Sequence, residues 1–352
     1  MAPGASDGDP APGLSRTDLV AIFRAMVLGR AAEERLELLF KQGHVKGGVY
    51  RGLGQEASAV GAAWALRRRT DGTGDIIGQT VRATGAVFLM GGTPVDYFRQ
   101  YLSRGTGPTR GREANVHWSD FQRGLLGPVS PLGTMAEVMA GITLAFKLRG
   151  EDRVGLVFGG DGQTSTGAWH EGVNFAAAQR CPMVIALEHN QWAFSTPTSR
   201  QTRLQSFTGK AAGYGVHAES VDGNDVLAVH AAAVRAVEHA RRGAGPALLE
   251  LRTYRRLGHA QHDPQDYVPA TELAYWEARD PVTRFRHVLE QEHGIPGSEL
   301  DHHVRTAEEE VRIAAERAVG EPAPDAREAG EQVRSDFDAP IPWTRAQPPL
   351  PA

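Results

Sequence analysis

Apolar residues recur at helical spacing in the N-terminal part of the chain. Leu19 and Met26 belong to a set of apolar positions that falls on one face of a helix. Ser15 and Asp18 just before this set have the spacing of a capping box, which predicts that the helix begins there. The Ala-rich stretch 55–69 predicts a second helix, because it ends in arginines, which favour a helix C-terminus.

The middle of the chain alternates apolar strand patterns with a helical pattern. Residues 154–158 and 183–187 are apolar runs typical of buried strands, and a helical pattern over 167–179 lies between them. This order predicts a βαβ unit with two parallel strands in one sheet. Residues 76–78 and 247–254 predict further strands. The predicted fold class is therefore α/β, a doubly wound, mostly parallel sheet with a helical C-terminal extension.

A long irregular segment and a further predicted helix lie between the strands predicted at 76–78 and 154–158. Residues 102–133 are rich in Gly, Arg and Pro and too long for a plain connection, which is typical of functional loops. Thr134 and Glu137 then have capping-box spacing, which predicts a helix from Thr134 to about Arg149.

The chain is expected to divide into three parts. Residues 1–15 are rich in Pro, Gly, Ala and Asp and are expected to be disordered. Residues 16–268 carry the strand patterns. Residues 269–352 are expected to form the helical extension, with charged helical patterns and an extended Pro-rich tail from Pro340.

Composition narrows the class of protein. Apolar residues make up 41% and charged residues 23%, which indicates a globular protein. With 38 Lys and Arg against 42 Asp and Glu, a net charge of −4 gives no basic surface for nucleic acid or an anionic membrane. Neither a membrane span of ~20 residues nor a secretory signal is apparent, so a soluble, cytoplasmic protein is expected. The single cysteine, Cys181, excludes an internal disulfide framework and is expected to be buried.

Polar residues follow the predicted strands where each one ends. Because ligands bind beyond the carboxyl ends of parallel strands, these loops are the candidate site. The loops carry Gln79 with Arg82, then Asp161, Asn190 and His259. A carboxylate and an amide oxygen suit Mg²⁺, whose octahedral coordination is usually completed by phosphates. Glycines around Asp161 let the backbone approach an anion, and Arg82 offers a forked phosphate contact. The residues alone therefore predict a magnesium–diphosphate site.

The two loops of the βαβ unit also carry a spaced motif. Gly160-Asp161-Gly162 precedes His189-Asn190 with 26 residues between them, residues 163–188. This resembles the thiamine diphosphate motif, which usually ends in two asparagines. Over roughly residues 15–319 the chain resembles the alpha subunit of the decarboxylating component of 2-oxo acid dehydrogenase complexes, the branched-chain 2-oxo acid and pyruvate dehydrogenase family. The matching stretches are Gly54-Gln55-Glu56-Ala57, Gly78-Gln79 with Arg82, Ser130-Pro131-Leu132-Gly133, residues 191–199, residues 221–225, Thr253-Tyr254-Arg255 and Gly258-His259.

The resemblance implies a role for each matched residue. Asp161, the Asn190 side chain and the Trp192 carbonyl would bind Mg²⁺, which bridges the two phosphates of thiamine diphosphate. A bulky apolar side chain at Leu132 would force the bent cofactor conformation. His259 matches the catalytic histidine, which handles protons during acyl transfer to lipoamide. The implied cofactor-binding residues are Gln79, Arg82, Ser130, Leu132, Gly160, Asp161, Gly162, Gln163, Asn190, Trp192, Ala193, Phe194 and His259.

The chain departs from the family pattern at a few positions. Val81 replaces a tyrosine beside the phosphate-contacting arginine, and His189 replaces the first asparagine of the motif. Glu188 stands where branched-chain members carry arginine, whereas pyruvate-type members also have glutamate. Ala260 replaces a regulatory serine of mitochondrial relatives. The differences at Val81, His189 and Glu188 bear on cofactor affinity more than on cofactor identity. Among the matched positions, Thr134 falls in a segment that holds potassium in some relatives.

The implied reaction is oxidative decarboxylation of a 2-oxo acid, followed by acyl transfer to the lipoyl group of an acyltransferase component. In this class a beta subunit supplies the activating carboxylate, so the chain is expected to act only as α2β2. Residues 194–199, 213–215, 275–276 and 284–287 look closer to branched-chain members, which favours substrates such as 3-methyl-2-oxobutanoate. The alternative is a pyruvate or acetoin dehydrogenase alpha subunit. Two other classes stay open: a silent scaffold subunit, and a magnesium-dependent phosphohydrolase, which needs more carboxylates near Asp161.

Overall fold

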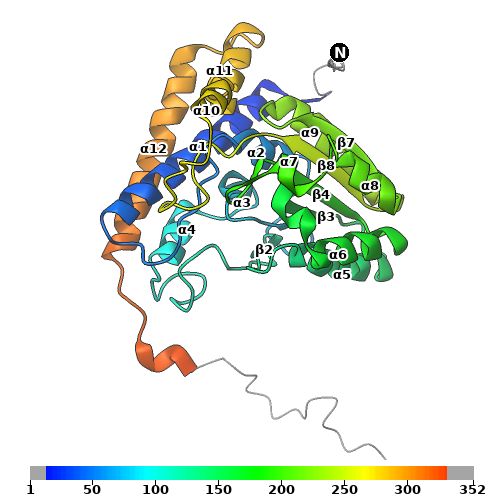
Figure 1. Cartoon of the computed structure of the whole chain (residues 1–352). Helices are drawn as coiled ribbons and strands as arrows, with labels where there is room; N and C mark the ends of the chain where they lie inside the picture. Colours follow the sequence, from blue (N-terminus) through cyan, green and yellow to red (C-terminus); the bar gives the residue numbers. More distant parts are fainter. Residues whose placement is uncertain (1–12, 331–352) are drawn as a thin grey trace, which may run out of the picture.

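The computed structural model describes residues 13–330, which fold around one six-stranded sheet with helices on both faces (Figure 1). Its strands run in the order β2-β1-β3-β4-β8-β7, and every neighbouring pair is parallel. The strands are β1 (Ile76–Gly78), β2 (Leu125–Leu126), β3 (Gly155–Gly160), β4 (Met183–His189), β7 (His217–Asp222) and β8 (Ala247–Arg252). The predicted α/β fold with a doubly wound parallel sheet is confirmed.

Helices bury apolar side chains against both faces of the sheet. One face is covered by α2 (Glu56–Trp64), α3 (Thr84–Leu89) and α9 (Val226–Arg241), and the other by α5 (Thr134–Leu148), α6 (Gly167–Ala178) and α8 (Thr208–Tyr214). Successive strand residues therefore reach different cores: Leu156 and Phe158 pack on the α9 side, and Val157 on the α5 side. Burial on both faces explains why β3 and β4 are continuous apolar runs.

A separate helical core lies beside the sheet. It is formed by α1 (Arg16–Lys41), α4 (Pro94–Tyr101), α11 (Pro281–Gln291) and α12 (Gly297–Gly320), and α12 lies alongside α1 (Figure 1). The capping box of Ser15 and Asp18 is present at the start of α1, as predicted. The C-terminal helices α11 and α12 therefore pack against the N-terminal helix α1 and not on a core of their own. The predicted division of the chain at residue 268 stays a prediction.

Short elements complete the described chain. A 3₁₀ turn, η1 (Asp161–Ser165), follows β3, and an antiparallel hairpin of β5 (Trp192–Ala193) and β6 (Thr196–Pro197) follows β4. The others are α7 (Thr198–Gln201), α10 (Ala270–Glu277) and η2 (Ala326–Gly330). The hairpin and η1 lie at the carboxyl edge of the sheet, where the candidate site was predicted.

One predicted helix end and one predicted helix cap were wrong, whereas the helix predicted from Thr134 to about Arg149 is confirmed as α5 (Thr134–Leu148). The second helix ends at Trp64 and not at Arg69, because the Asp75 side chain accepts from the Arg67 amide at 2.8 Å and draws the chain out of the helix. The capping box at Thr134 is absent: Gly133, with φ of 86°, is the N-cap residue and no side chain caps α5.

The strand limits also differ from the predictions. The strand predicted over 154–158 begins at Gly155 and continues to Gly160, so Gly159 and Gly160 are strand residues and not part of a loop. The strand predicted over 247–254 ends at Arg252. The charged helical patterns after Pro269 form three helices, because Asp280 caps a new helix that begins at Pro281.

Other predictions concern burial and the chain ends. Cys181 is buried, as predicted. The Pro-rich tail and most of the N-terminal segment lie outside the described residues. Within residues 13–330, no helix combines the length and the apolar content that crossing a bilayer requires.

Candidate active site

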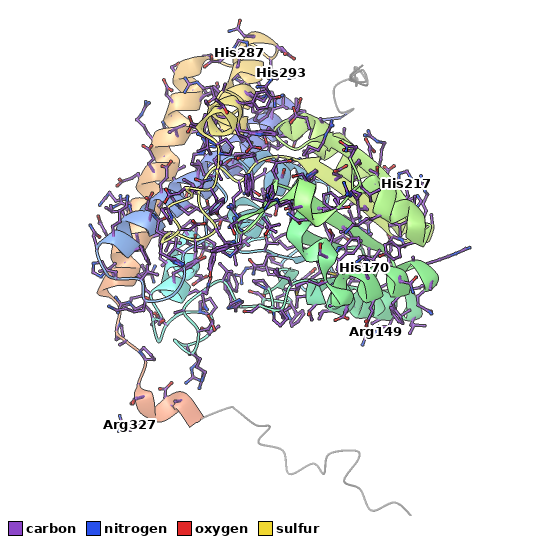
Figure 2. All side chains as sticks on the ribbon, viewed as in Figure 1. Arg149, His170, His217, His287, His293 and Arg327 are labelled. Carbon is purple, nitrogen blue, oxygen red and sulfur yellow. The ribbon has the colours of Figure 1, made fainter. Side chains whose placement is uncertain are left out.

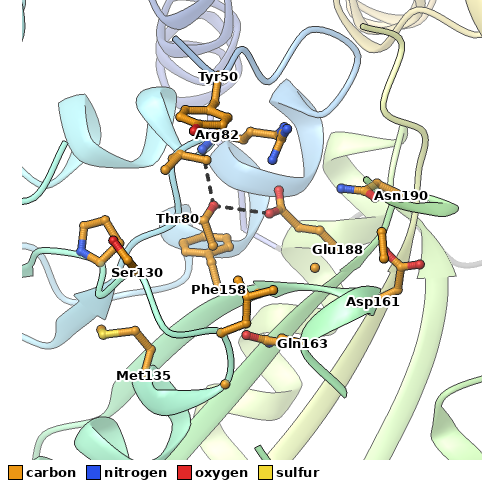
Figure 3. A pocket seen from close by; sticks show the side chains of 18 of the residues that line it. Tyr50, Thr80, Arg82, Ser130, Met135, Phe158, Asp161, Gln163, Glu188 and Asn190 are labelled. Carbon is orange, nitrogen blue, oxygen red and sulfur yellow. Dashed lines mark hydrogen bonds between the residues drawn. The ribbon is translucent and has the colours of Figure 1, made fainter. Parts of the chain in front are cut away.

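A cavity of about 560 Å³ lies beyond the carboxyl ends of β1, β3, β4 and β8 (Figure 3). Every residue predicted to bind the cofactor lines this cavity. The parallel sheet explains this, because it gathers the loops that leave all four strand ends at one edge. The cavity opens at the surface, where Leu132 and Phe194 are 64% and 50% exposed.

Asp161 is the buried acid of the cavity. It is 1% exposed and is the first residue of η1, directly after β3. Its Oδ2 accepts from Thr198 Oγ1 at 2.8 Å and from Gln201 Nε2 at 2.9 Å. Burial raises the pKa of Asp161, while the Thr198 and Gln201 hydrogen bonds oppose this shift. These donors fix the position of the carboxyl group and leave its Oδ1 facing Asn190, in the loop that follows β4.

Three oxygen atoms converge where the β3 and β4 loops meet. Asn190 Nδ2 donates to Gln55 Oε1 at 3.1 Å, which turns Asn190 Oδ1 toward Asp161 Oδ1 at 3.2 Å and the Trp192 carbonyl oxygen at 3.3 Å. Without a proton or a cation between them, these oxygens repel. Turning the Asn190 amide over, with the unpaired Gln55 Nε2 then donating to it, would replace these contacts by hydrogen bonds to Asp161 and the Trp192 carbonyl. A cation between the three groups is what would favour the orientation that brings the oxygens together.

The spacing of these oxygens suits a small cation. Neighbouring ligands of an octahedral Mg²⁺ at ~2.1 Å lie about 3.0 Å apart, close to the distances between these oxygens. A carboxylate, an amide oxygen and a backbone carbonyl are ligands that Mg²⁺ prefers. Within residues 13–330 no group of three or more His, Cys, Asp or Glu side chains could hold a metal. The residues fit a cation whose remaining ligands come from outside this chain.

Close backbone packing holds the two metal-facing loops together. A Cβ on Gly162 would lie 2.6 Å from Ala193 Cβ, so only glycine lets η1 approach the β5–β6 hairpin. Gln191 and Phe194 have φ of 74° and 51°, in the left-handed region that such residues rarely adopt. Strained residues of this kind cluster at functional sites.

Two titratable side chains that line the cavity, Arg82 and Glu188, each have a buried atom without a hydrogen-bond partner (Figure 3). Arg82 Nη2 donates to the His259 carbonyl at 2.6 Å, but the buried Nε has no partner. Burial, aided by Arg255, lowers the pKa of Arg82 to about 10, so the guanidinium stays charged at neutral pH. Glu188 Oε2 accepts from Thr80 at 3.5 Å and Oε1 has no partner. Burial raises the pKa of Glu188 to about 7, although the Arg82 charge opposes this.

His259 lies between two aromatic rings. Tyr50 and Phe194 contact it edge-on, with ring centroids 5.4 and 4.9 Å away, and its amide donates to Asp263 Oδ2 at 2.6 Å. Burial and the charges of Arg82 and Arg255 lower the pKa of His259 to about 4. The imidazole is therefore neutral at physiological pH and can accept a proton.

Comparison with known proteins identifies the family. Residues 24–327 match the family described as the dehydrogenase E1 component. The chain belongs to this family. It is 34% identical to the alpha subunit of acetoin:2,6-dichlorophenolindophenol oxidoreductase of Cupriavidus necator, over 91% of this chain and 94% of the relative. It is 36% identical to the 3-methyl-2-oxobutanoate dehydrogenase alpha subunit of Mycobacterium tuberculosis, over 86% and 78%.

A third relative, the pyruvate dehydrogenase E1 component alpha subunit of Rhizobium meliloti, is 30% identical over 89% of both chains. The resemblance that the motifs indicated is therefore confirmed. The E1 family implies the use of thiamine diphosphate, and the chain is an E1-type, thiamine-dependent dehydrogenase component. The three relatives act on different substrates, so these identities leave the substrate open.

Several residues of this E1 cavity were not predicted from the sequence. Asn115 and His117 line it from the segment 102–133. His117 Nδ1 lies 3.2 Å from Glu113 Oε1 and its Nε2 lies 3.4 Å from Ser130 Oγ. The unusual length of this segment could have indicated that it contributes residues to the site. Figure 2 labels four other histidines, none of which lines the cavity: His170, His217, His287 and His293.

Arg255 and Tyr50 were also missed as parts of the cavity. Arg255 is fully buried and its Nη2 donates to the Phe194 carbonyl at 2.8 Å, which holds the hairpin against β8. Nη1 donates to the Trp192 carbonyl at 3.4 Å. Tyr50 could have been predicted as a cavity residue from its position just before the Gly54-Gln55-Glu56 motif.

His189, which departs from the family pattern, and Thr134, which matches a potassium-binding segment of some relatives, lie outside the cavity. His189 points into the core, where its Nδ1 is 2.8 Å from Glu250 Oε1. Burial would raise the pKa of Glu250, but hydrogen bonds from His189, Ser206 and the Phe207 amide lower it to about 2. Thr134 begins α5 and is absent from the residues that line the cavity.

Proposed function

We propose that this chain is the alpha subunit of a thiamine diphosphate- and Mg²⁺-dependent 2-oxo acid dehydrogenase. The observation that carries the proposal is the convergence of the Asp161 carboxylate, the Asn190 side-chain amide and the Trp192 carbonyl in one cavity. Arg82 and His259 share that cavity. Membership of the E1 family and relatives named as alpha subunits support the same assignment.

The residues at the strand ends would hold the cofactor. Asp161, Asn190 and Trp192 would bind Mg²⁺, and the Arg82 guanidinium, which lines the same cavity, would contact the diphosphate. Gly162 would let the backbone come close to the anion. When bound, thiamine diphosphate supplies the carbon nucleophile and the electron sink for decarboxylation. The chain positions these groups and shields the reacting atoms from water.

His259 is the proton-transfer group of this chain. Its neutral imidazole accepts a proton, and the neighbouring Arg82 and Arg255 charges favour release of that proton afterwards. Tyr50 and Phe194 fix the plane of the ring. These properties suit transfer of the acyl group to the lipoyl group of an acyltransferase component.

A beta subunit would complete the site. Leu132 and Phe194 leave the cavity open at the surface, and within residues 13–330 the only other sheet is the short β5–β6 hairpin. The carboxylate that activates the cofactor would therefore come from a partner chain, in an α2β2 assembly.

The favoured substrate is a branched-chain 2-oxo acid such as 3-methyl-2-oxobutanoate. Two observations favour this substrate. Residues 194–199 and 284–287 resemble those of branched-chain members of the family. The Mycobacterium tuberculosis relative is named as a 3-methyl-2-oxobutanoate dehydrogenase subunit. Acetoin is the second candidate, because the Cupriavidus necator relative matches over 94% of its length.

Co-expression with a beta subunit tests the proposal. The complex is expected to reduce an artificial electron acceptor with a 2-oxo acid, faster with 3-methyl-2-oxobutanoate than with pyruvate or acetoin. The chain alone and a complex carrying Asp161→Ala are expected to be inactive. Cofactor-independent phosphate release, or cofactor binding that Asp161→Ala leaves unchanged, would contradict the proposal.

A further inference from the structure

Glu33 of α1 is a buried acid that the proposed reaction does not use. It is 5% exposed. Its Oε2 accepts from the Gly52 amide at 2.7 Å and its Oε1 accepts from Thr84 Oγ1 at 2.8 Å. One carboxyl group therefore contacts two segments that are far apart in the sequence, residues near 52 and the first turn of α3.

Both segments lead directly to cavity residues. Gly52 follows Tyr50 by two residues, and Thr84 follows Arg82 by two. A Cβ on Gly52 would lie 2.5 Å from the Arg82 carbonyl oxygen, so the two segments are in backbone contact. Figure 3 shows Tyr50 and Arg82 side by side at the same end of the cavity.

Tyr50 and Arg82 in turn hold the His259 loop. Arg82 Nη2 donates to the His259 carbonyl, and the Tyr50 ring contacts the imidazole edge-on. The Gln261 amide donates to the Val49 carbonyl at 2.9 Å, which ties the same two loops together. A small shift of the 50–52 segment would therefore displace both the guanidinium and the imidazole.

We infer that Glu33 is a positioning residue of this site: its carboxyl group holds residues 50–52 against the start of α3, so that Arg82 reaches the cofactor diphosphate beside His259. This inference rests on the proposed function, because it takes the diphosphate as the ligand of Arg82. Binding sites of this kind require side chains held within about 0.5 Å by a supporting layer of hydrogen bonds.

Calorimetric titration of the α–β complex with thiamine diphosphate, at saturating Mg²⁺, tests the inference. Glu33→Ala is expected to weaken cofactor binding at least tenfold, the size of effect that lost supporting hydrogen bonds have at such sites. Glu33→Gln is expected to bind within about threefold of the wild type. Its amide oxygen can accept from Gly52 while its nitrogen donates to Thr84, so the conservative variant restores what alanine removes.

Asp75→Asn is the matched control for loss of a buried acid. Asp75 is 1% exposed and accepts from the Arg67 and Val154 amides at the opposite edge of the sheet. This variant is expected to lower the Tm and leave cofactor affinity unchanged. Should Glu33→Ala not fold, Thr84→Val removes one of the two hydrogen bonds and is expected to weaken binding about threefold.

The outcomes separate this inference from the proposed function. No cofactor binding by the wild-type complex would refute the proposed function itself. Wild-type binding together with unchanged affinity in Glu33→Ala or, failing that, in Thr84→Val would overturn the positioning role. Equal losses in Glu33→Gln and Glu33→Ala would overturn it as well, because both hydrogen bonds can form in the glutamine variant.

Discussion

The metal site depends on the charge of a single residue. Three groups converge at this site: the Asp161 carboxyl group, the Asn190 amide and the Trp192 carbonyl. Only Asp161 can carry a negative charge, so it supplies most of the attraction for a cation. Asp161→Asn keeps the side-chain shape and removes that charge. We expect Mg²⁺-dependent binding of thiamine diphosphate to weaken about 100-fold or more, as measured by calorimetry on the α–β complex. A loss of less than about threefold would exclude Asp161 as a ligand.

His259 is expected to affect chemistry more than cofactor binding. Replacing a proton-transfer group typically costs about 100- to 10,000-fold in rate, so His259→Gln is expected to lose lipoyl acylation by that amount. Cofactor affinity is expected to change little, since Arg82 donates to the backbone of residue 259 and not to its ring. Unchanged acylation kinetics would remove His259 from the mechanism.

His259 also makes stability depend on pH. Its pKa in the folded chain is about 4, below the usual value, so the unfolded chain binds the proton more readily. The stability that the neutral imidazole contributes is present above pH 6.5 and is lost as the pH falls toward 4.

Glu33 shifts stability in the opposite direction. Burial, together with the Glu56 charge, raises its pKa to about 8, so the folded chain retains a proton that the unfolded chain releases. This contribution to stability is complete below pH 4.5 and is lost as the pH rises through 8. Glu33→Gln removes the titration. We expect the Tm difference between the wild type and this variant to change by more than about 3 °C between pH 5 and 8.5.

Calorimetric melting over that pH range measures this effect. Glu188, with its pKa near 7, contributes to the wild-type slope and remains in the variant, so the difference isolates Glu33. A constant difference in Tm between the two proteins would contradict the assigned pKa.

At the level of elements, contact between η1 and the β5–β6 hairpin sets the distance between the metal-facing loops. Gly162→Ala places a methyl group 2.6 Å from Ala193 Cβ, which forces the two elements apart. We expect a loss of about 1–3 kcal/mol in stability, with weaker cofactor binding. Thermal unfolding and calorimetric titration measure the two effects.

Gly167→Ala is the control for this substitution. Gly167 begins α6, and a Cβ there meets only Glu171 Oε1 at 3.8 Å. Alanine is expected to be neutral or stabilising at this position. Equal stability and equal cofactor affinity in the two variants would show that the contact with Ala193 does not limit the residue at position 162.

Elements that are buried on both faces could be predicted from the sequence, whereas edge elements could not. β3 and β4 are apolar runs because helices cover both sides. β7 (His217–Asp222) is an edge strand without an apolar run, and β2 is two residues long, so neither has a sequence pattern. The Thr134 capping box failed because Gly133 reaches the helix in a left-handed conformation, which local spacing cannot indicate.

For the whole molecule, the sheet topology explains how much of the site was predictable. Asp161, Asn190 and His259 follow strand ends, and a parallel sheet brings such ends together whatever the paths of the other loops. Tyr50, Asn115 and His117 enter the cavity from segments outside the strand ends, and their routes depend on tertiary contacts. Substrate choice depends further on surface that this chain leaves open at Leu132 and Phe194.

The central claim is that Asp161, Asn190 and Trp192 bind one cation. The most direct test is a crystal structure of the α–β complex grown with thiamine diphosphate and Mn²⁺ in place of Mg²⁺. We predict one anomalous difference peak within about 2.3 Å of Asp161 Oδ1, Asn190 Oδ1 and the Trp192 carbonyl oxygen. A peak elsewhere, or an Asn190 amide whose nitrogen faces Asp161 with no ion between them, would contradict the account.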